Sequence, residues 1–403
     1  MPSKFPARCS TIAVLLAAIW SAGAVAGEGD LLTLTASAGY SYDSNVFRIG
    51  SDRKPTGQDH RDDSIWSASV GAELNKVIGR QRFYGNGSVT QSQYQDFDFL
   101  NNTGYQGTLG YRLGFGSDSE AGVYYSRSNL LNNYADLTGY YKRNMLSSER
   151  YGGDVLLRIA GDWVGVGSVT QGHDENSASD RQAGNSDIRA FDAGVRYAPR
   201  GSKNYIESRY RESSVDYERV GGATNYDYVQ REVRVTGLWS PNQISSLEAS
   251  AARVRSSHED LQSSDFSGWS GYVGYIWRPT IVSSTNLRLS RDVGAAGDGW
   301  GSYARTNGIS LKQTWQATSK LGFDANLGYQ RRVFSGYQTV GLAASTGEDE
   351  RRDTVYTTGI GGSYAITDKL STRLSLRNER RLSSIDVYSF TDTIAVLNAQ
   401  YKF

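Results

Sequence analysis

The chain has 403 residues, and its 43 Lys and Arg nearly balance its 42 Asp and Glu, so the formal net charge is +1. This balance excludes the strongly basic composition of a nucleic-acid-binding protein and the acidic excess of a disordered one. The 27 Tyr, 8 Trp and 12 Phe stand beside 45 Gly and only 6 Pro. That composition is typical of a membrane β-barrel, which needs aromatic rings at both membrane interfaces and alternation in place of long apolar runs.

The N-terminal segment, residues 1–26, has the pattern of a secretory signal peptide. Lys4 and Arg8 supply a positive region, residues 11–20 supply an apolar core too short to span a bilayer, and an Ala-Val-Ala sequence ends the segment. Cleavage there would leave a single domain from residue 27 to residue 403.

The lone cysteine, Cys9, lies inside this signal segment. The mature chain therefore has no cysteine for disulfides, thiolate catalysis or metal binding. No later apolar run approaches the 18 residues that a membrane-spanning helix needs. The chain is expected to cross a membrane with strands.

Apolar residues recur at every second position along most of the mature chain. The first such run has Leu32, Leu34, Ala36, Ala38, Tyr40 and Tyr42 on one face and polar residues on the other. The same alternation returns at 66–74, 105–113, 191–197, 269–277 and 321–329. This period predicts strands with one apolar and one polar face, and no helix after residue 26.

Short and long connections between these strands alternate. Tight turns are predicted at 79–80, 116–118, 161–162, 199–201, 241–242, 279–280, 318–319 and 367–368. Longer polar stretches fall at 44–63, 130–148, 173–186, 219–224 and 335–350. Outer-membrane barrels have short periplasmic turns and long external loops, so we predict an antiparallel up-and-down barrel of about 18 strands, with 16 as the alternative. Both termini would lie in the periplasm.

The turn spacing of about 40 residues also suits the blades of a β-propeller. A blade needs four short strands in each period, whereas each period here holds two runs long enough to cross a membrane when tilted. The sequence therefore favours the barrel.

The three histidines, His60, His173 and His258, are all predicted to lie in outer connections, and none has a partner at metal-ligand spacing. Some outer-membrane barrels are enzymes with a Ser/His/Asp site at the rim, but such a site needs a histidine on a strand. The sequence predicts no enzyme, no metal and no cofactor.

Arginine dominates the basic residues of the polar face. Charge facing lipid at mid-depth costs about 2–4 kcal/mol for each Arg, so these side chains must face the lumen. Two interpretations stay open: the arginines pair with inward acids and stiffen the barrel, or some stay unpaired and line a cationic path for a polyanion. The candidate residues of that path are Arg209, Arg211, Arg234, Arg288, Arg332, Arg373 and Arg377.

The C-terminus ends an alternating strand with aromatic residues, Tyr401 and Phe403. A terminal aromatic residue of this kind resembles the signal by which the barrel-assembly machinery recognises its substrates. We expect these two residues to act as an assembly signal.

The first strand ends in a tyrosine-rich segment and the sequence Asp43-Ser44-Asn45-Val46-Phe47-Arg48. This segment resembles one near the mature N-terminus of the outer-membrane proteins of exopolysaccharide operons, the EpsL-like group. The resemblance covers about ten residues and transfers no catalytic or binding residue.

What the resemblance implies is a Gram-negative outer-membrane barrel that secretes an exopolysaccharide, with the polysaccharide chain, outer-membrane lipid and periplasmic and inner-membrane export components as partners. The alternative function is a general or substrate-specific diffusion porin for small solutes. Nucleic acid is not an expected partner.

Overall fold

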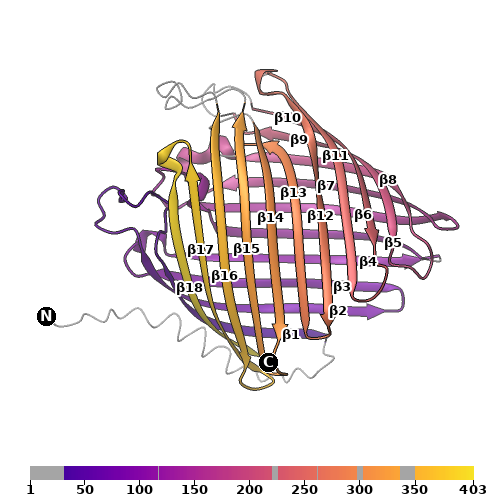
Figure 1. Cartoon of the computed structure of the whole chain (residues 1–403), viewed down its shortest axis with the longest axis horizontal. Helices are drawn as coiled ribbons and strands as arrows, with labels where there is room; N and C mark the ends of the chain where they lie inside the picture. Colours follow the sequence, from indigo (N-terminus) through magenta and orange to yellow (C-terminus); the bar gives the residue numbers. More distant parts are fainter. Residues whose placement is uncertain (1–30, 117, 220–225, 261, 297–302, 336–349) are drawn as a thin grey trace.

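The computed structural model describes residues 31–403, apart from 117, 220–225, 261, 297–302 and 336–349. Eighteen antiparallel strands follow one another around a single sheet. In Figure 1 the strands of one wall run steeply in front, and those of the opposite wall cross behind them, because strands tilt when a sheet closes into a barrel. The predicted fold and strand number are confirmed.

The strands are 12–16 residues long, enough for a tilted strand to cross a bilayer. Their bounds are β1 (Leu32–Asp43), β2 (Asp63–Ile78), β3 (Gln81–Tyr94), β4 (Asn102–Phe115), β5 (Ser119–Leu131), β6 (Met145–Ala160), β7 (Trp163–Asn176), β8 (Ser186–Tyr197), β9 (Tyr205–Tyr217), β10 (Tyr228–Trp239), β11 (Ser245–His258), β12 (Phe266–Thr280), β13 (Ser283–Ala295), β14 (Tyr303–Gln316), β15 (Leu321–Ser335), β16 (Arg351–Ala365), β17 (Leu370–Ser383) and β18 (Phe390–Lys402).

The sheet closes because β1 pairs with both β2 and β18. Ala38 lies opposite Ala68 of β2 on one side and opposite Ala399 of β18 on the other. Closure leaves no strand edge unpaired, which is the condition for a sheet to exist in lipid. Within the described residues, no helix is both long and apolar enough to span a bilayer.

The outer surface of the barrel carries the apolar face that the alternation predicts. Trp66 is 56% exposed and Leu109 is 61% exposed, and both belong to the outward-facing set of their strands. Aromatic pairs cross neighbouring strands on this surface, with the rings of Tyr40 and Trp66 at 4.8 Å and those of Trp163 and Tyr197 at 5.2 Å. The polar side chains of the same strands face inward, as lipid contact requires.

The two ends of the barrel differ. The short-turn end carries tight reversals such as Gly79-Arg80 and Gly161-Asp162, in which both glycines adopt positive φ. The long-loop end carries the longer connections, several with one turn of 3-10 helix: η1 (Asp98–Leu100), η2 (Tyr134–Asp136), η3 (Ser179–Gly184), η4 (Gln262–Ser264) and η6 (Asp386–Tyr388).

Two predictions about this long-loop end were wrong. His173 lies inside β7 and His258 is the last residue of β11, because both strands continue beyond the alternating apolar run that marks the membrane. Their Nδ1 atoms contact Asp187 and Asp265, at 2.9 Å and 3.3 Å. Short 3-10 turns also occur where no helix was predicted, since local i to i+3 bonds compact a loop without apolar periodicity.

Some sequence predictions fall outside the described residues. The signal peptide, most of the loop 219–224 and almost all of the loop 335–350 belong to them.

The orientation of the barrel can be tested with epitope tags. A tag inserted beside Gly57, in the long connection after β1, is expected to react with antibody on intact cells, whereas a tag beside Pro241 in a short turn is not. The physical reason is that long loops face the outside and short turns face the periplasm. Labelling of the tag at Pro241 together with protection of the tag at Gly57 would show that the barrel has the opposite orientation.

The C-terminal residue takes part in closing the sheet. The backbone N–H of Phe403 donates to the carbonyl of Leu34 at 3.0 Å, and its ring packs edge-on against Tyr401 at 5.0 Å. We expect Phe403→Asp to reduce assembly, because it places a charge at the end of the closing strand. The heat-modifiable gel shift of the folded barrel measures this, and an unchanged folded yield would contradict an assembly signal.

Candidate functional site: the lumen of the barrel

The inward face of β8, β9 and β10 carries an alternating row of acids and arginines. Arg209 lies 2.9 Å from Asp192 and 2.6 Å from Glu207, and Glu207 also accepts from Arg196 at 2.7 Å. On the next strand Arg234 pairs with Glu232. The acids are nearly buried against the wall, whereas the arginines are more exposed. These pairs satisfy inward charges that have little access to bulk water.

The opposite wall repeats this arrangement on β17. Arg373 reaches across to Asp324 of β15 at 2.5 Å, and Arg377 pairs with Glu379 of its own strand at 2.5 Å. Both arginine side chains remain about half exposed, at 45% and 55%. A half-exposed guanidinium keeps donors available to a passing solute while its neighbouring acid fixes its position.

The other candidate arginines have different surroundings. Arg288 packs over the ring of Tyr272, with Cζ at 3.7 Å from the ring centroid, and Arg332 donates to Gln330 at 3.3 Å. Arg211 is exposed on the inward face of β9. Arg211 and Arg288 form no ion pair with a described acid. The structure thus places the seven candidates on the lumen face but spreads them over two walls.

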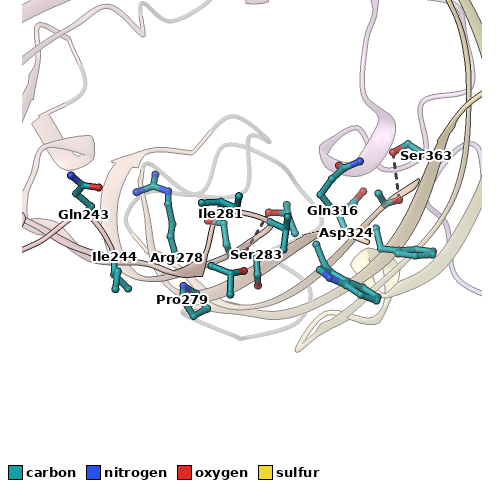
Figure 2. Close-up of a pocket in the computed structure, with 16 residues that line it drawn as sticks. Gln243, Ile244, Arg278, Pro279, Ile281, Ser283, Gln316, Asp324 and Ser363 are labelled. Atoms are coloured by element: carbon teal, nitrogen blue, oxygen red, sulfur yellow. Dashed lines mark hydrogen bonds between the residues drawn. The ribbon is translucent and has the colours of Figure 1, made fainter. Parts of the chain in front are cut away.

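The short-turn mouth of the lumen holds a cavity of about 610 Å³ against the wall made by β12 to β16 (Figure 2). Polar side chains including Arg278, Gln316, Asp324 and Ser363 line it. Asp324 is also the partner of Arg373, so this cavity leads directly to the arginines of β17.

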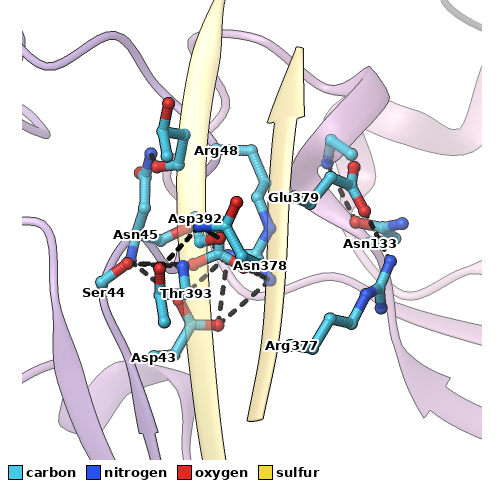
Figure 3. Close-up of polar contacts among 12 residues, drawn as sticks. Asp43, Ser44, Asn45, Arg48, Asn133, Arg377, Asn378, Glu379, Asp392 and Thr393 are labelled. Carbon is cyan, nitrogen blue, oxygen red and sulfur yellow. Dashed lines mark hydrogen bonds and ion pairs between the residues drawn. The ribbon is translucent and has the colours of Figure 1, made fainter. Parts of the chain in front are cut away.

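The long-loop mouth is narrowed by residues 132–144, the connection between β5 and β6, which we term the inserted loop. Arg381 of β17 donates to the carbonyl of Ala135 in this loop at 2.7 Å, and Arg381 is only 2% exposed. Five strands separate β5 from β17 around the sheet, so this contact crosses the opening. Figure 3 shows Asn133 of the loop on the inner side of β17, beside Glu379 and Arg377.

An apolar cluster holds the inserted loop. Phe47, 1% exposed, lies at its centre, with the rings of Phe97, Tyr134 and Tyr141 at 5.1, 4.9 and 5.3 Å. These residues come from the first three long connections, so three loops share one core. Burying four rings together gives the loops a fixed shape.

The segment before Phe47 is fixed by polar contacts to β18 (Figure 3). Asn45 is fully buried and donates to the carbonyls of Ile49 and Thr391 at 2.7 and 3.0 Å. Arg48 bridges Asp43 at 3.0 Å and Asp392 at 3.2 Å. Residues 43–48, on which the family resemblance rests, therefore anchor the loop cluster to the rim.

A second contact ties the inserted loop to η3. Lys142 lies 2.5 Å from Asp180, and the hydroxyl of Tyr140 donates to the same carboxylate at 3.1 Å. The hydrogen bond from Lys142 is the main cause that lowers the pKa of Asp180. Burial, followed by the hydrogen bond that its hydroxyl makes to Asp180, raises the pKa of Tyr140 to about 12. Acidification through the lowered pKa of Asp180 would weaken this contact.

The inserted loop could not be found from the alternating pattern, because a loop that enters the lumen has no strand period. The signal available in the sequence was the concentration of aromatic residues at 94–100 and 134–141, which exceeds what a solvated loop needs. Among the described residues, no group of three His, Cys, Asp or Glu side chains is arranged to hold a metal.

Comparison with known proteins shows the fold. No family model matches the chain, and no curated protein matches it. Among solved structures, Pseudomonas aeruginosa OccK2 (OpdF) has a TM-score of 0.50 and 13% identity, covering 92% of this chain and 98% of that chain. Pseudomonas aeruginosa OpdO has a TM-score of 0.50 and 14% identity, covering 94% and 99%. The structure of OccK2 in complex with glucuronate has a TM-score of 0.50 and 12% identity, covering 92% of this chain and 98% of that chain.

The chain thus has the closed 18-stranded barrel fold of the Pseudomonas OccK and Opd porins. The EpsL-like resemblance receives no support from these comparisons.

Proposed function

We propose that this protein is an outer-membrane diffusion porin that selects small solutes, with a preference for anions. The observation that carries the proposal is a closed 18-stranded barrel with an apolar outer surface and a lumen lined by ion pairs and half-exposed arginines. An apolar outer surface on a closed barrel suits lipid, and a charged interior suits water and polar solutes.

The size of the barrel supports passage of a solute. Barrels of about 16–18 strands leave an aqueous channel, whereas eight strands give an interior that side chains fill. The cavity at the short-turn mouth is polar on its lumen side, and the arginines of β17 stand above it. A solute leaving or entering at this mouth would meet Arg373 first and Arg377 next.

The preference for anions rests on exposed guanidinium groups. Arg211 and Arg288 form no ion pair with a described acid, and Arg373 and Arg377 stay half exposed despite their pairs. A guanidinium presents donors that match a carboxylate in two-point geometry. The similar barrel of OccK2 has been solved in complex with glucuronate, a sugar carboxylate.

The diffusion porin replaces exopolysaccharide secretion as our leading function. The inserted loop and its aromatic cluster occupy part of the long-loop mouth, and Arg381 holds the loop against the far wall. A fixed narrowing suits small solutes better than a continuous polymer.

Liposome swelling tests the proposed function. Vesicles that contain the purified full chain are expected to swell rapidly in isotonic sodium gluconate and slowly in an isotonic neutral trisaccharide. Equal swelling rates in both solutes, faster than in protein-free vesicles, would contradict the proposed selectivity. Swelling no faster than that of protein-free vesicles would contradict the proposed pore.

A further inference from the structure

Two tyrosines and two glycines form one row across the lumen wall of β3, β4, β5 and β6. Tyr84 lies opposite Gly110, Gly110 opposite Tyr124, and Tyr124 opposite Gly152. All four face the lumen, because their strand neighbours Phe83, Leu109 and Val123 are exposed on the outer surface. The row alternates a large ring with a residue that has no side chain.

Each glycine provides the space over which a tyrosine ring lies. A Cβ placed at Gly110 would overlap the ring of Tyr84, and one placed at Gly152 would overlap the ring of Tyr124. Each ring is therefore turned along the wall and covers the neighbouring strand. A ring in this position offers one face to the wall and the other to the lumen.

Within the described residues, neither ring stacks on another aromatic ring and neither hydroxyl makes a hydrogen bond. Arg82 lies over the ring of Tyr84, with its Cζ 5.7 Å from the ring centroid. Both tyrosines are half-buried. Both rings thus keep exposed surface on which no other described aromatic ring stacks, and Arg82 adds a donor beside Tyr84.

Polar side chains border the row on both sides. Towards the short turns, Arg82 lies opposite Arg112, which is held by Glu120 at 2.7 Å and Asp154 at 3.1 Å. Towards the long loops stand three inward residues that lie opposite one another on three strands, namely Asn86, Thr108 and Ser126. Hydrogen-bond donors and acceptors thus lie on both sides of the row, at the next inward position along each strand.

We propose that Tyr84 and Tyr124 form a stacking site for pyranose sugars in the lumen. A pyranose presents a face of C–H bonds that packs on an aromatic ring and a rim of hydroxyl groups that need hydrogen-bond partners. The two tyrosines are two strands apart, roughly 9.6 Å, which is wider than the step between the two linked rings of a disaccharide, so each tyrosine offers a separate stacking position. This site deepens the proposed diffusion function, on which it rests, by adding small pyranose sugars to the solutes that the pore binds beside the anions that the arginines favour.

The row also has a direction. Tyr84 is the fourth residue of β3 and Tyr124 the sixth residue of β5, both counted from the short-turn end. The row is in register across the sheet, so Tyr124 lies two residues further from the short-turn end of its own strand only because the tilted strands are staggered. A sugar that moves from Tyr84 to Tyr124 therefore also moves towards the long-loop end.

The test measures how maltose interrupts ion current through the purified full chain in a planar bilayer. We expect reversible interruption by maltose and none by mannitol, which has hydroxyl groups but no ring. Tyr84→Leu with Tyr124→Leu should weaken the maltose association constant by about tenfold, because the variant has lost the ring face at both stacking positions. Replacing both residues by Phe should keep most of the affinity, because the ring faces remain.

Gly110→Ala supplies a second and independent variant. It keeps both rings but displaces that of Tyr84, so maltose affinity should fall although no aromatic residue is lost. Tyr105→Leu, on the outward face of β4, is the matched control and should leave maltose affinity unchanged. The heat-modifiable gel shift verifies that each variant is folded.

Equal maltose affinity in wild type, the double leucine variant and Gly110→Ala would overturn the site, as would equal interruption by mannitol. Current without sugar reports the diffusion function separately. Calorimetric titration of maltose into the detergent-solubilised barrel measures the site even without current. Maltose binding without ion current would contradict the proposed pore but support the stacking site. Ion current without maltose binding would support the pore but contradict the stacking site.

Discussion

Replacing Arg373 and Arg377 together by serine should turn the pore from anion-selective towards cation-selective. The change removes two half-exposed positive charges and leaves their partners, Asp324 and Glu379, facing the lumen without them. We expect the chloride-to-potassium permeability ratio, obtained from the zero-current potential across a KCl gradient, to fall by roughly twofold or more. In wild type the preference should fade as salt rises from about 0.1 M to 1 M, because screening shortens from about 10 Å to 3 Å.

A matched control removes two arginines from the other face of neighbouring strands. Arg331 of β15 and Arg352 of β16 are exposed and face outward at the long-loop end. Their double replacement by serine removes the same charge from the chain but not from the lumen, so selectivity should stay as in wild type. A wild-type pore that favours cations would contradict the anion hypothesis. So would unchanged selectivity in a folded variant in which Arg373 and Arg377 are both replaced.

Opening the long-loop mouth is the second large expected effect. Phe47→Ala removes the central ring of the cluster that holds the inserted loop, and such a loss in a packed core costs about 3–5 kcal/mol. The buried residues of this cluster lie outside the paired strands, so we expect a folded barrel with a higher single-channel conductance and more current noise.

Phe99→Ala is the control for this variant. Phe99 sits at the edge of the same cluster, 38% exposed and 6.3 Å from Phe47, so its loss should have a much smaller effect on conductance. If Phe47→Ala keeps its gel shift and its conductance equals that of wild type, then the inserted loop does not limit the pore.

The strands could be predicted because lipid imposes a strict rule on each of them. The alternation of inward and outward positions along a strand was enough to assign Leu109 to the outer surface and Arg209 to the lumen. A shift of the strand by one residue would place charged side chains in lipid. Turn lengths then gave the strand number and the two ends of the barrel.

Side-chain partners within the lumen could not be predicted in the same way. Arg288, for example, forms no ion pair with a described acid but packs over the ring of Tyr272 on the neighbouring strand. Arg373 selects Asp324, which is 49 residues earlier in the chain and two strands away. Such contacts depend on strand tilt and on the reach of a long side chain across a neighbouring glycine, Gly361 in this case.

The loop cluster lies beyond the reach of any period in the sequence. Phe47, Phe97 and Tyr134 come from three connections that meet only once the barrel has closed. The short segment 43–48 was recognisable as a motif, but its role as a bridge from Asp43 to Asp392 requires β18 to lie beside β1.

We propose above all that this closed barrel conducts ions and small solutes through its lumen. Purified full-length protein that shows the heat-modifiable shift of a folded barrel should be added to a planar lipid bilayer in KCl at constant voltage. Discrete, uniform upward steps in current are expected as single barrels insert. Folded protein that inserts into the membrane and produces no steps at any voltage would contradict this proposal.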